Sequence, residues 1–188
     1  MIETATPFLT GRFLLAMPGM ADPRFEQAII LMVAHDEDGA LGIGIGQERQ
    51  GLRVKDLLRQ LGLEHDRAPD APVLHGGPVE PGRGFVLHSD DWGGQDTVEI
   101  GSLCRMTATQ DVLKAIGQGE GPARFLVSLG YAGWAGGQLE EELTRHGWMD
   151  APGDDAILFE GTTPTRWQRA FEALGIDPAL LSPDSGAA

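Results

Sequence analysis

The chain has 188 residues and a formal net charge of −14, from 28 acidic and 14 basic side chains. This length suits one domain, which can bury roughly 70% of the surface that its unfolded chain exposes. An acidic surface repels phosphate backbones and anionic lipid, so we expect no direct binding to nucleic acid or to a membrane. The single cysteine, Cys104, excludes an intrachain disulfide framework and a cysteine-rich zinc site.

The N-terminal residues lack the basic flank and the long apolar run of a signal peptide. The longest apolar run, residues 28–34, is too short to span a bilayer. We therefore expect a cytoplasmic protein. No repeat or linker divides the chain, so residues 1–188 are predicted to form one domain with a mobile tail at residues 182–188.

The predicted elements begin with strands. A short apolar run at residues 13–17 predicts a buried strand. A second run at residues 28–33, followed by turn-forming residues 36–39, predicts a hairpin. In the return strand, residues 41–46, leucine or isoleucine alternates with glycine. This alternation predicts that another part of the chain packs closely on the glycine side.

A helix and further strands follow. Apolar residues at helical spacing over residues 54–61, with Gly62 after them, predict an amphipathic helix. Strands are predicted at residues 73–75 and 84–88, and the glycine-containing link between them indicates a wide hairpin. Residues 97–106 have the composition of one more strand.

The C-terminal half alternates helices and strands. Thr109 can N-cap a short helix, and residues 123–129 form the next predicted strand. Acidic residues 140–142 occupy the first turn of a helix, where the helix dipole favours carboxylates. Short strands are predicted at residues 148–149 and 156–159. A Thr-Pro pair then opens the last helix.

The most specific stretch is residues 129–143, L-G-Y-A-G-W-A-G-G-Q-L-E-E-E-L. Glycine tolerates a positive φ angle and a close approach of backbones. Glycines therefore predict a tight strand-to-helix turn around Tyr131 and Trp134, with Gln138 opening the helix. The glycines of this stretch are Gly130, Gly133, Gly136 and Gly137.

Five segments together carry a family resemblance. They are L-A-M-P-G-M-A-D-P-R-F (15–25), A-H-D-E-D-G-A-L-G (34–42), G-G-P-V (76–79), R-G-F-V-L-H (83–88) and G-Y-A-G-W-A-G-G-Q-L-E-E-E (130–142). In this order they make the chain similar, over nearly its whole length, to the YqgE/AlgH family of bacterial proteins. The chain departs from the family pattern at residues 46–49 and at His146.

The resemblance implies an α+β fold with a single domain. In that fold a bent, bifurcated mixed β-sheet forms a pseudo-barrel with helices packed outside. The resemblance implies at most a role as a transcriptional regulator, and it implies no reaction.

Metal binding finds little support in the sequence. His35, His75 and His88 fall near strand ends, but their spacings match no metal-ligand motif. Histidines that form hydrogen bonds with the backbone are the favoured interpretation. We therefore predict neither a metal nor another cofactor.

Catalytic motifs are also missing, and we assign no catalytic residue. The glycines of residues 41–46 lie inside a strand rather than at a strand-to-helix turn, which argues against a nucleotide loop. Cys104 has apolar neighbours and is predicted to be a buried thiol. The carboxylates of residues 140–142 could supply a general base, but a solvated helix start is the favoured interpretation.

The remaining candidate is a binding surface made by two glycine-rich turns. Backbone amides at Gly76 and Gly77, beside the side chains of Tyr131, Trp134 and Gln138, would suit a small ligand or a peptide. The alternative is that the two aromatic rings only fill the core beneath the turn, and we weigh this alternative slightly higher.

We favour a non-catalytic binding or regulatory module, which would act indirectly on transcription through protein contacts. The alternative is an enzyme with an unrecognised small-molecule site near the G-G-P-V and G-Y-A-G-W turns. The partner is accordingly an unidentified protein or a small ligand. A deep cleft that gathers ionisable residues would favour the enzyme, and a shallow apolar patch would favour the binding module.

Overall fold

The computed structural model describes residues 8–19, 25–145 and 147–181. Its strands are β1 (Phe13–Ala16), β2 (Ile29–Asp36), β3 (Gly39–Gly44), β4 (Glu48–Arg53), β5 (Pro72–His75), β6 (Val79–His88), β7 (Val98–Ile100), β8 (Cys104–Thr107), β9 (Phe125–Ala135) and β10 (Trp148–Ala151). Its helices are α1 (Val54–Gln60), α2 (Gln110–Gly117), α3 (Gln138–Thr144), α4 (Asp155–Phe159) and α5 (Arg166–Ala173), with the 3₁₀ turns η2 (Thr163–Thr165) and η3 (Pro178–Leu181). The predicted mobile tail lies outside the described residues.

Strand β9 joins two parts of one sheet. The strand order is β10-β1-β2-β3-β9-β6-β8-β7, and β5 pairs with both β4 and β9. The first half of β9 lies between β5, in parallel, and β6, antiparallel. Its second half pairs with β3. The sheet is therefore mixed and divides along β9, which confirms the bent, bifurcated α+β fold.

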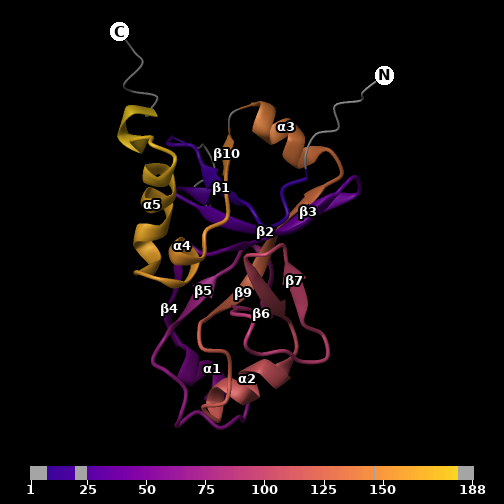
Figure 1. Cartoon of the computed structure of the whole chain (residues 1–188), viewed down its shortest axis with the longest axis vertical. Helices are drawn as coiled ribbons and strands as arrows, with labels where there is room; N and C mark the ends of the chain where they lie inside the picture. Colours follow the sequence, from indigo (N-terminus) through magenta and orange to yellow (C-terminus); the bar gives the residue numbers. More distant parts are fainter. Residues whose placement is uncertain (1–7, 20–24, 146, 182–188) are drawn as a thin grey trace.

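Figure 1 shows the two lobes that result. The upper lobe contains β1, β2, β3 and β10 with α3, α4 and α5, and the lower lobe contains β4 to β8 with α1 and α2. Separate apolar cores lie under the helices: one includes Phe171 of α5, one includes Leu58 of α1 and Ile116 of α2, and one includes Leu139 of α3. No helix in the described ranges is long and apolar enough to cross a lipid bilayer.

Several predicted elements are confirmed. β2 and β3 form the expected hairpin, with Asp36 paired to Gly39. The glycine side of β3 is closely packed, because a Cβ on Gly44 would lie 2.9 Å from the carbonyl oxygen of His75. Helix α2 begins after Thr109 as predicted. The hydroxyl of Thr109, however, donates to Asp111 Oδ1 at 2.5 Å instead of capping the helix backbone.

Three predicted elements are wrong. The strands at 73–75 and 84–88 do not form a hairpin, because β9 lies between them. Residues 97–106 form two strands that turn at Gly101, where φ is +54°. Residues 156–159 are helical, because the carboxylate of Asp154 accepts the first free backbone N–H groups of α4.

The glycine-rich stretch also differs from its prediction. β9 continues through Tyr131 and Trp134 to Ala135, so residues 129–135 of the stretch are strand. Only Gly136 and Gly137 form the turn to α3. The pairing of β9 with β3 accounts for the difference. It keeps the backbone extended at glycines that local propensity would assign to a turn.

Candidate functional site

The segment Gly76-Gly77 passes over β9 as the chain crosses from β5 to β6. The N–H of Gly76 donates to the carbonyl of Leu129 at 2.8 Å, and its own carbonyl accepts from the N–H of Gly44 at 2.7 Å. A Cβ on Gly76 would collide with the carbonyl oxygen of Gly130. A Cβ on Gly77 would collide with the backbone carbonyl of Tyr131, the next residue of β9. Glycine is required at both positions because the two backbones are in contact.

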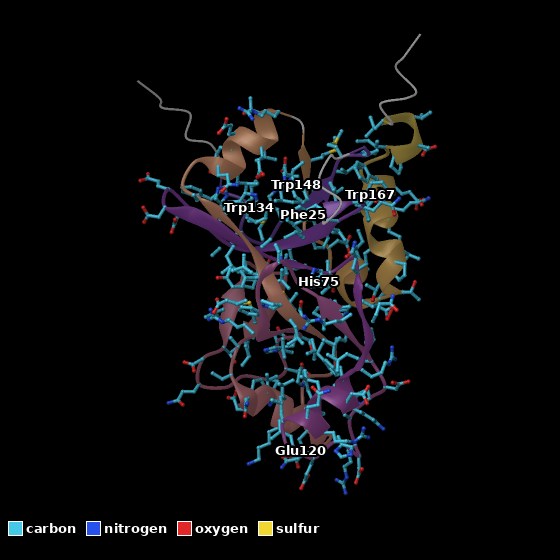
Figure 2. All side chains as sticks on the ribbon, turned by 180° about the vertical axis from the view of Figure 1, so that it is seen from behind. Phe25, His75, Glu120, Trp134, Trp148 and Trp167 are labelled. Atoms are coloured by element: carbon cyan, nitrogen blue, oxygen red, sulfur yellow. The ribbon has the colours of Figure 1, made fainter. Side chains whose placement is uncertain are left out.

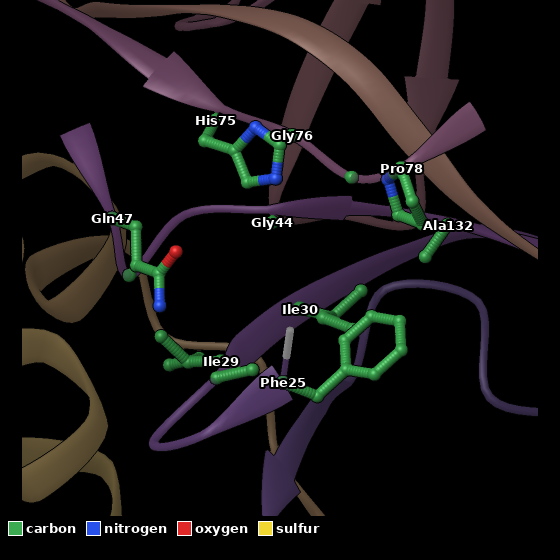
Figure 3. A pocket seen from close by; sticks show the side chains of 12 residues that line it. Phe25, Ile29, Ile30, Gly44, Gln47, His75, Gly76, Pro78 and Ala132 are labelled. Atoms are coloured by element: carbon green, nitrogen blue, oxygen red, sulfur yellow. The ribbon is translucent and has the colours of Figure 1, made fainter. Parts of the chain in front are cut away.

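A small pocket opens beside this crossing, where the two lobes meet (Figure 3). It is lined by Phe25, Ala28, Ile29, Ile30, Gly44, Gly46, Gln47, His75, Gly76, Gly77, Pro78 and Ala132. Its enclosed volume is about 30 Å³. A water molecule needs about 10–15 Å³ of such space, and pockets that enclose whole ligands measure about 300–1,000 Å³. The pocket therefore fits the tip of a side chain or a water.

The polar groups of the pocket come from His75 and Gln47. The N–H of His75 donates to the carbonyl of Gln47 at 2.9 Å, which holds the two residues side by side. Both side chains border the pocket in Figure 3. Within the described part of the chain, neither side chain forms a hydrogen bond. The pocket thus offers an imidazole and a carboxamide whose hydrogen-bonding groups are open to a ligand.

The electrostatic surroundings keep His75 neutral. Burial, and secondarily the positive charge of Arg49, lower the pKa of His75 from its ordinary value of 6.5. A neutral imidazole carries one donor and one acceptor. At physiological pH the pocket therefore presents uncharged hydrogen-bonding groups beside an apolar wall.

The apolar wall faces these groups. Phe25 lies across the pocket from His75, with Ile30, Pro78 and Ala132 completing the apolar side (Figure 3). An apolar surface with a few polar groups placed to fix orientation is the usual composition of a recognition site.

The predicted aromatic residues lie elsewhere. The indole of Trp134 is 8% exposed and packs against Trp148, with the ring centroids 6.2 Å apart. Figure 2 shows both tryptophans in the upper lobe. Tyr131 packs on the edge of the Phe85 ring at 6.0 Å, and a hydrogen bond with Glu80 raises its pKa.

Gln138 stabilises the turn before α3. Its side-chain carbonyl accepts the N–H of Ala135 at 3.0 Å. The five predicted binding residues therefore do not form one surface. Only Gly76 and Gly77 line the pocket, and Trp134 fills the core as the alternative interpretation proposed.

The other two histidines of the sequence prediction are held by protein groups. His88 is fully buried, and its Nδ1–H donates to the carbonyl of Ser89 at 2.8 Å. His35 accepts the N–H of Leu9 at Nδ1, at 3.0 Å. The interpretation of histidines bonded to backbone is confirmed for these two and is wrong for His75.

A larger, open cleft of about 510 Å³ runs between α4 and the turn that joins β7 to β8. It gathers charged side chains, but several are already paired. Arg124 lies 3.4 Å from Asp155, and Arg105 lies 3.8 Å from Glu99. Such exposed ion pairs are common on protein surfaces and are not specific evidence of a reaction.

Groups with shifted pKa values are dispersed over the molecule. Burial raises the pKa of Cys104 to about 12 and lowers that of Arg166 to about 10. Burial also raises the pKa of Glu142, which lies near Trp134. Catalytic sites usually bring such groups together. Here only His88 and Asp91, among the described groups with shifted pKa values, act on each other's pKa, and Arg166 and Glu142 lie in other parts of the fold.

Sequence reasoning missed most of the pocket. Phe25 belongs to the family segment 15–25 but was not selected as a binding residue, Gln47 matched no motif, and His75 was predicted to bond to backbone rather than to a ligand. The G-G-P-V segment was the available signal, since two of its glycines line the pocket.

Comparisons with known proteins agree with the fold. A family model described as AlgH-like matches residues 13–179. A UPF0301 protein of Novosphingobium aromaticivorans is 56% identical over 181 residues, covering 96% of this chain and 97% of the relative. The solution structure of the AlgH protein from Pseudomonas aeruginosa matches with a TM-score of 0.79 at 42% identity, covering 100% of both chains. A Corynebacterium diphtheriae protein shares the fold at 18% identity, with a TM-score of 0.73 over 96% of this chain and 94% of the other.

Proposed function

The chain belongs to the AlgH-like family, and we propose that it is a non-catalytic binding module that docks a peptide segment of a partner protein in the pocket beside His75. A regulatory effect on transcription would then be indirect, through this protein contact.

The observation that carries the proposal is the pairing of open polar groups with an apolar wall. The side chains of His75 and Gln47 have no hydrogen-bond partner among the described residues, and both border an apolar pocket. Gln47 is exposed, but His75 is partly buried, and a partly buried polar group gains free energy when a ligand supplies its missing hydrogen bond. A peptide supplies both a donor and an acceptor from each backbone unit.

The size of the pocket supports a peptide over a metabolite. An enclosed volume of about 30 Å³ admits a methyl or hydroxyl group but not a nucleotide or a cofactor. The rest of such a partner would lie on the outer surface. Because the net charge is −14, we expect the flanks of the docked segment to be basic and the association to weaken with added salt.

An enzyme is the second candidate, and one observation favours it. A neutral imidazole with a free acceptor nitrogen can remove a proton from a bound substrate. In that case His75 would be the general base and the substrate would bind at the outer rim of the pocket. Among the described residues, no other group with a shifted pKa lines this pocket, which supports the binding module instead.

Site-specific photocrosslinking tests the proposal. A photoreactive amino acid at position 47 should form a crosslink to a defined peptide of a partner in native lysate, and the same amino acid at the exposed position 168 should not. His75→Ala should reduce the crosslink about tenfold, as loss of a buried hydrogen bond does. His65→Ala is the matched control, because His65 lies outside the pocket.

The outcomes separate the candidates. Equal crosslinking from positions 47 and 168, or an unchanged yield with His75→Ala, would refute the docking pocket. A crosslink to a small metabolite that depends on His75 would favour the enzyme.

A further inference from the structure

The side chain of His35 links three parts of the upper lobe. It extends from β2 and is only 1% exposed. Its Nδ1 accepts the backbone N–H of Leu9 at 3.0 Å, and its Nε2 lies 2.5 Å from Oε1 of Glu140 in α3. The imidazole therefore holds both α3 and the N-terminal segment, residues 8–9.

These contacts define where the ring proton lies. A backbone N–H can only donate, so Nδ1 carries no proton while Leu9 is bound. The carboxylate of Glu140 accepts, so the proton is on Nε2. In this state His35 is neutral, and both of its nitrogens are used.

A second proton on His35 is incompatible with the contact to Leu9. Protonation places a hydrogen on Nδ1, and two N–H groups then face each other in a site without access to water. The bond to Glu140 persists and is strengthened, because a carboxylate attracts an imidazolium. Proton uptake by His35 thus breaks the hydrogen bond with Leu9 and keeps the bond with Glu140.

The other groups around His35 do not replace the lost acceptor. The N-terminal segment presents the edge of the Phe8 ring, with the two ring centroids 5.2 Å apart. β3 presents Ala40, which is paired with His35 across the hairpin. The neighbouring carboxylate of Asp36 accepts the N–H of Asp38 at 2.8 Å. Glu140 is therefore the charged group in direct contact with the ring among the described residues.

We propose that His35 is a proton-sensitive latch: the neutral imidazole holds the N-terminal segment through the N–H of Leu9, and protonation releases that segment while α3 stays attached. Leu9 is 5% exposed and packs in the same core as Trp134 and Leu139. Its release uncovers part of that apolar core.

The direction with pH follows from the proton count. The released state binds one more proton than the latched state, so acid favours release. In the range where the released imidazole is protonated, the equilibrium constant for release rises about tenfold for each unit of pH lost.

Nuclear magnetic resonance on the full chain tests the latch. At pH 8 the imidazole nitrogen shifts of His35 should report a proton on Nε2 and none on Nδ1. Between pH 8 and 5 the hydrogen-exchange protection of the Leu9 amide, corrected for the intrinsic pH dependence of exchange, should fall at least tenfold. The amide of Gly11 is the internal reference, because it donates to the carbonyl of Met32 at 2.8 Å and does not contact His35.

His35→Asn supplies the matched variant, since its Oδ1 takes the place of Nδ1 and can accept from Leu9 but does not titrate. Its Leu9 protection should be independent of pH after the same correction. A proton on Nδ1 at pH 8 would overturn the latch. So would a wild-type Leu9 protection that is unchanged at pH 5, or one that falls only together with that of Gly11.

Discussion

The indole Nε1–H of Trp134 donates to Oε2 of Glu142 across 2.5 Å, and this bond ties the end of β9 to α3. The ring itself lies in an apolar core with Trp148 and Leu139. A side chain that combines burial with a hydrogen bond between two elements is expected to contribute strongly to folding.

Trp134→Ala should therefore reduce the free energy of unfolding by about 3–5 kcal/mol, as large-to-small core substitutions do. Trp134→Phe keeps most of the apolar contact and loses the bond to Glu142, so its cost should be smaller. Urea denaturation of the three proteins measures both effects. Equal midpoints for wild type and Trp134→Ala would contradict the placement of this ring in the core.

Gln138→Ala should have a small effect on stability. It removes the acceptor for the N–H of Ala135, but both residues are exposed and water can replace the lost bond. We expect a loss of less than about 1 kcal/mol in the same denaturation experiment.

Partner capture by this variant compares the two candidate surfaces. A loss of capture would place the contact at the turn before α3 rather than at His75.

Alanine at the strand crossing should be severely destabilising. A Cβ on Gly76 would collide with the backbone carbonyl of Gly130, and that carbonyl cannot move without distorting β9. Gly76→Ala should lower the melting temperature strongly or prevent folding. Gly82→Ala is the control, since a Cβ there has open space around it. Similar melting temperatures for both variants would show that the crossing tolerates a side chain.

Local patterns predicted the elements whose formation depends on local residues. The helix at α1 and the hairpin of β2 and β3 follow from apolar spacing and from turn residues close in sequence. The insertion of β9 between β5 and β6 could not be predicted in this way. It brings residues 125–129 beside residues 73–75 and 84–88, and no pattern within either segment encodes that pairing.

The candidate site was predictable only in part for the same reason. Gly76 and Gly77 were selected for backbone amides that could bind a ligand; both line the pocket, but the N–H of Gly76 donates to Leu129 instead. Gln47 reaches the pocket because β4 pairs with β5, which holds its carbonyl against the N–H of His75. That pairing is a tertiary feature, so the position of Gln47 has no signature in the sequence.

Cys104 should react slowly with thiol reagents in the native protein. Burial raises its pKa to about 12, so very little thiolate is present at pH 8, and the side chain is 6% exposed. Labelling with iodoacetamide should be at least a hundredfold faster in denaturant than in native buffer. Comparable rates in the two conditions would mean that the thiol is accessible in the folded state.

Folding stability should fall in mild acid because of His88. Its Nδ1–H donates to Ser89, and its Nε2 accepts from the hydroxyl of Thr107 at 2.8 Å. Burial, as the largest cause, lowers the pKa of His88 below its ordinary value of 6.5. The unfolded chain therefore takes up the proton first. The contribution of neutral His88 to the free energy of unfolding is therefore complete above pH 6.5, and it is lost as the pH falls below 6.5.

Urea unfolding at pH 8, 6.5 and 5 measures this loss when wild type is compared with His88→Gln, whose carboxamide can also donate and accept but does not titrate. The variant should be less stable than wild type at pH 8, and the difference should narrow at pH 5 because only wild type loses the contribution of His88. His75 is present in both proteins, so its own titration cancels in the comparison. Titration of the His88 ring by nuclear magnetic resonance to a pKa above 6.5 would contradict the assignment, because burial and the charge of Arg105 lower this pKa and outweigh the opposing effects of the Ser89 carbonyl and Asp91.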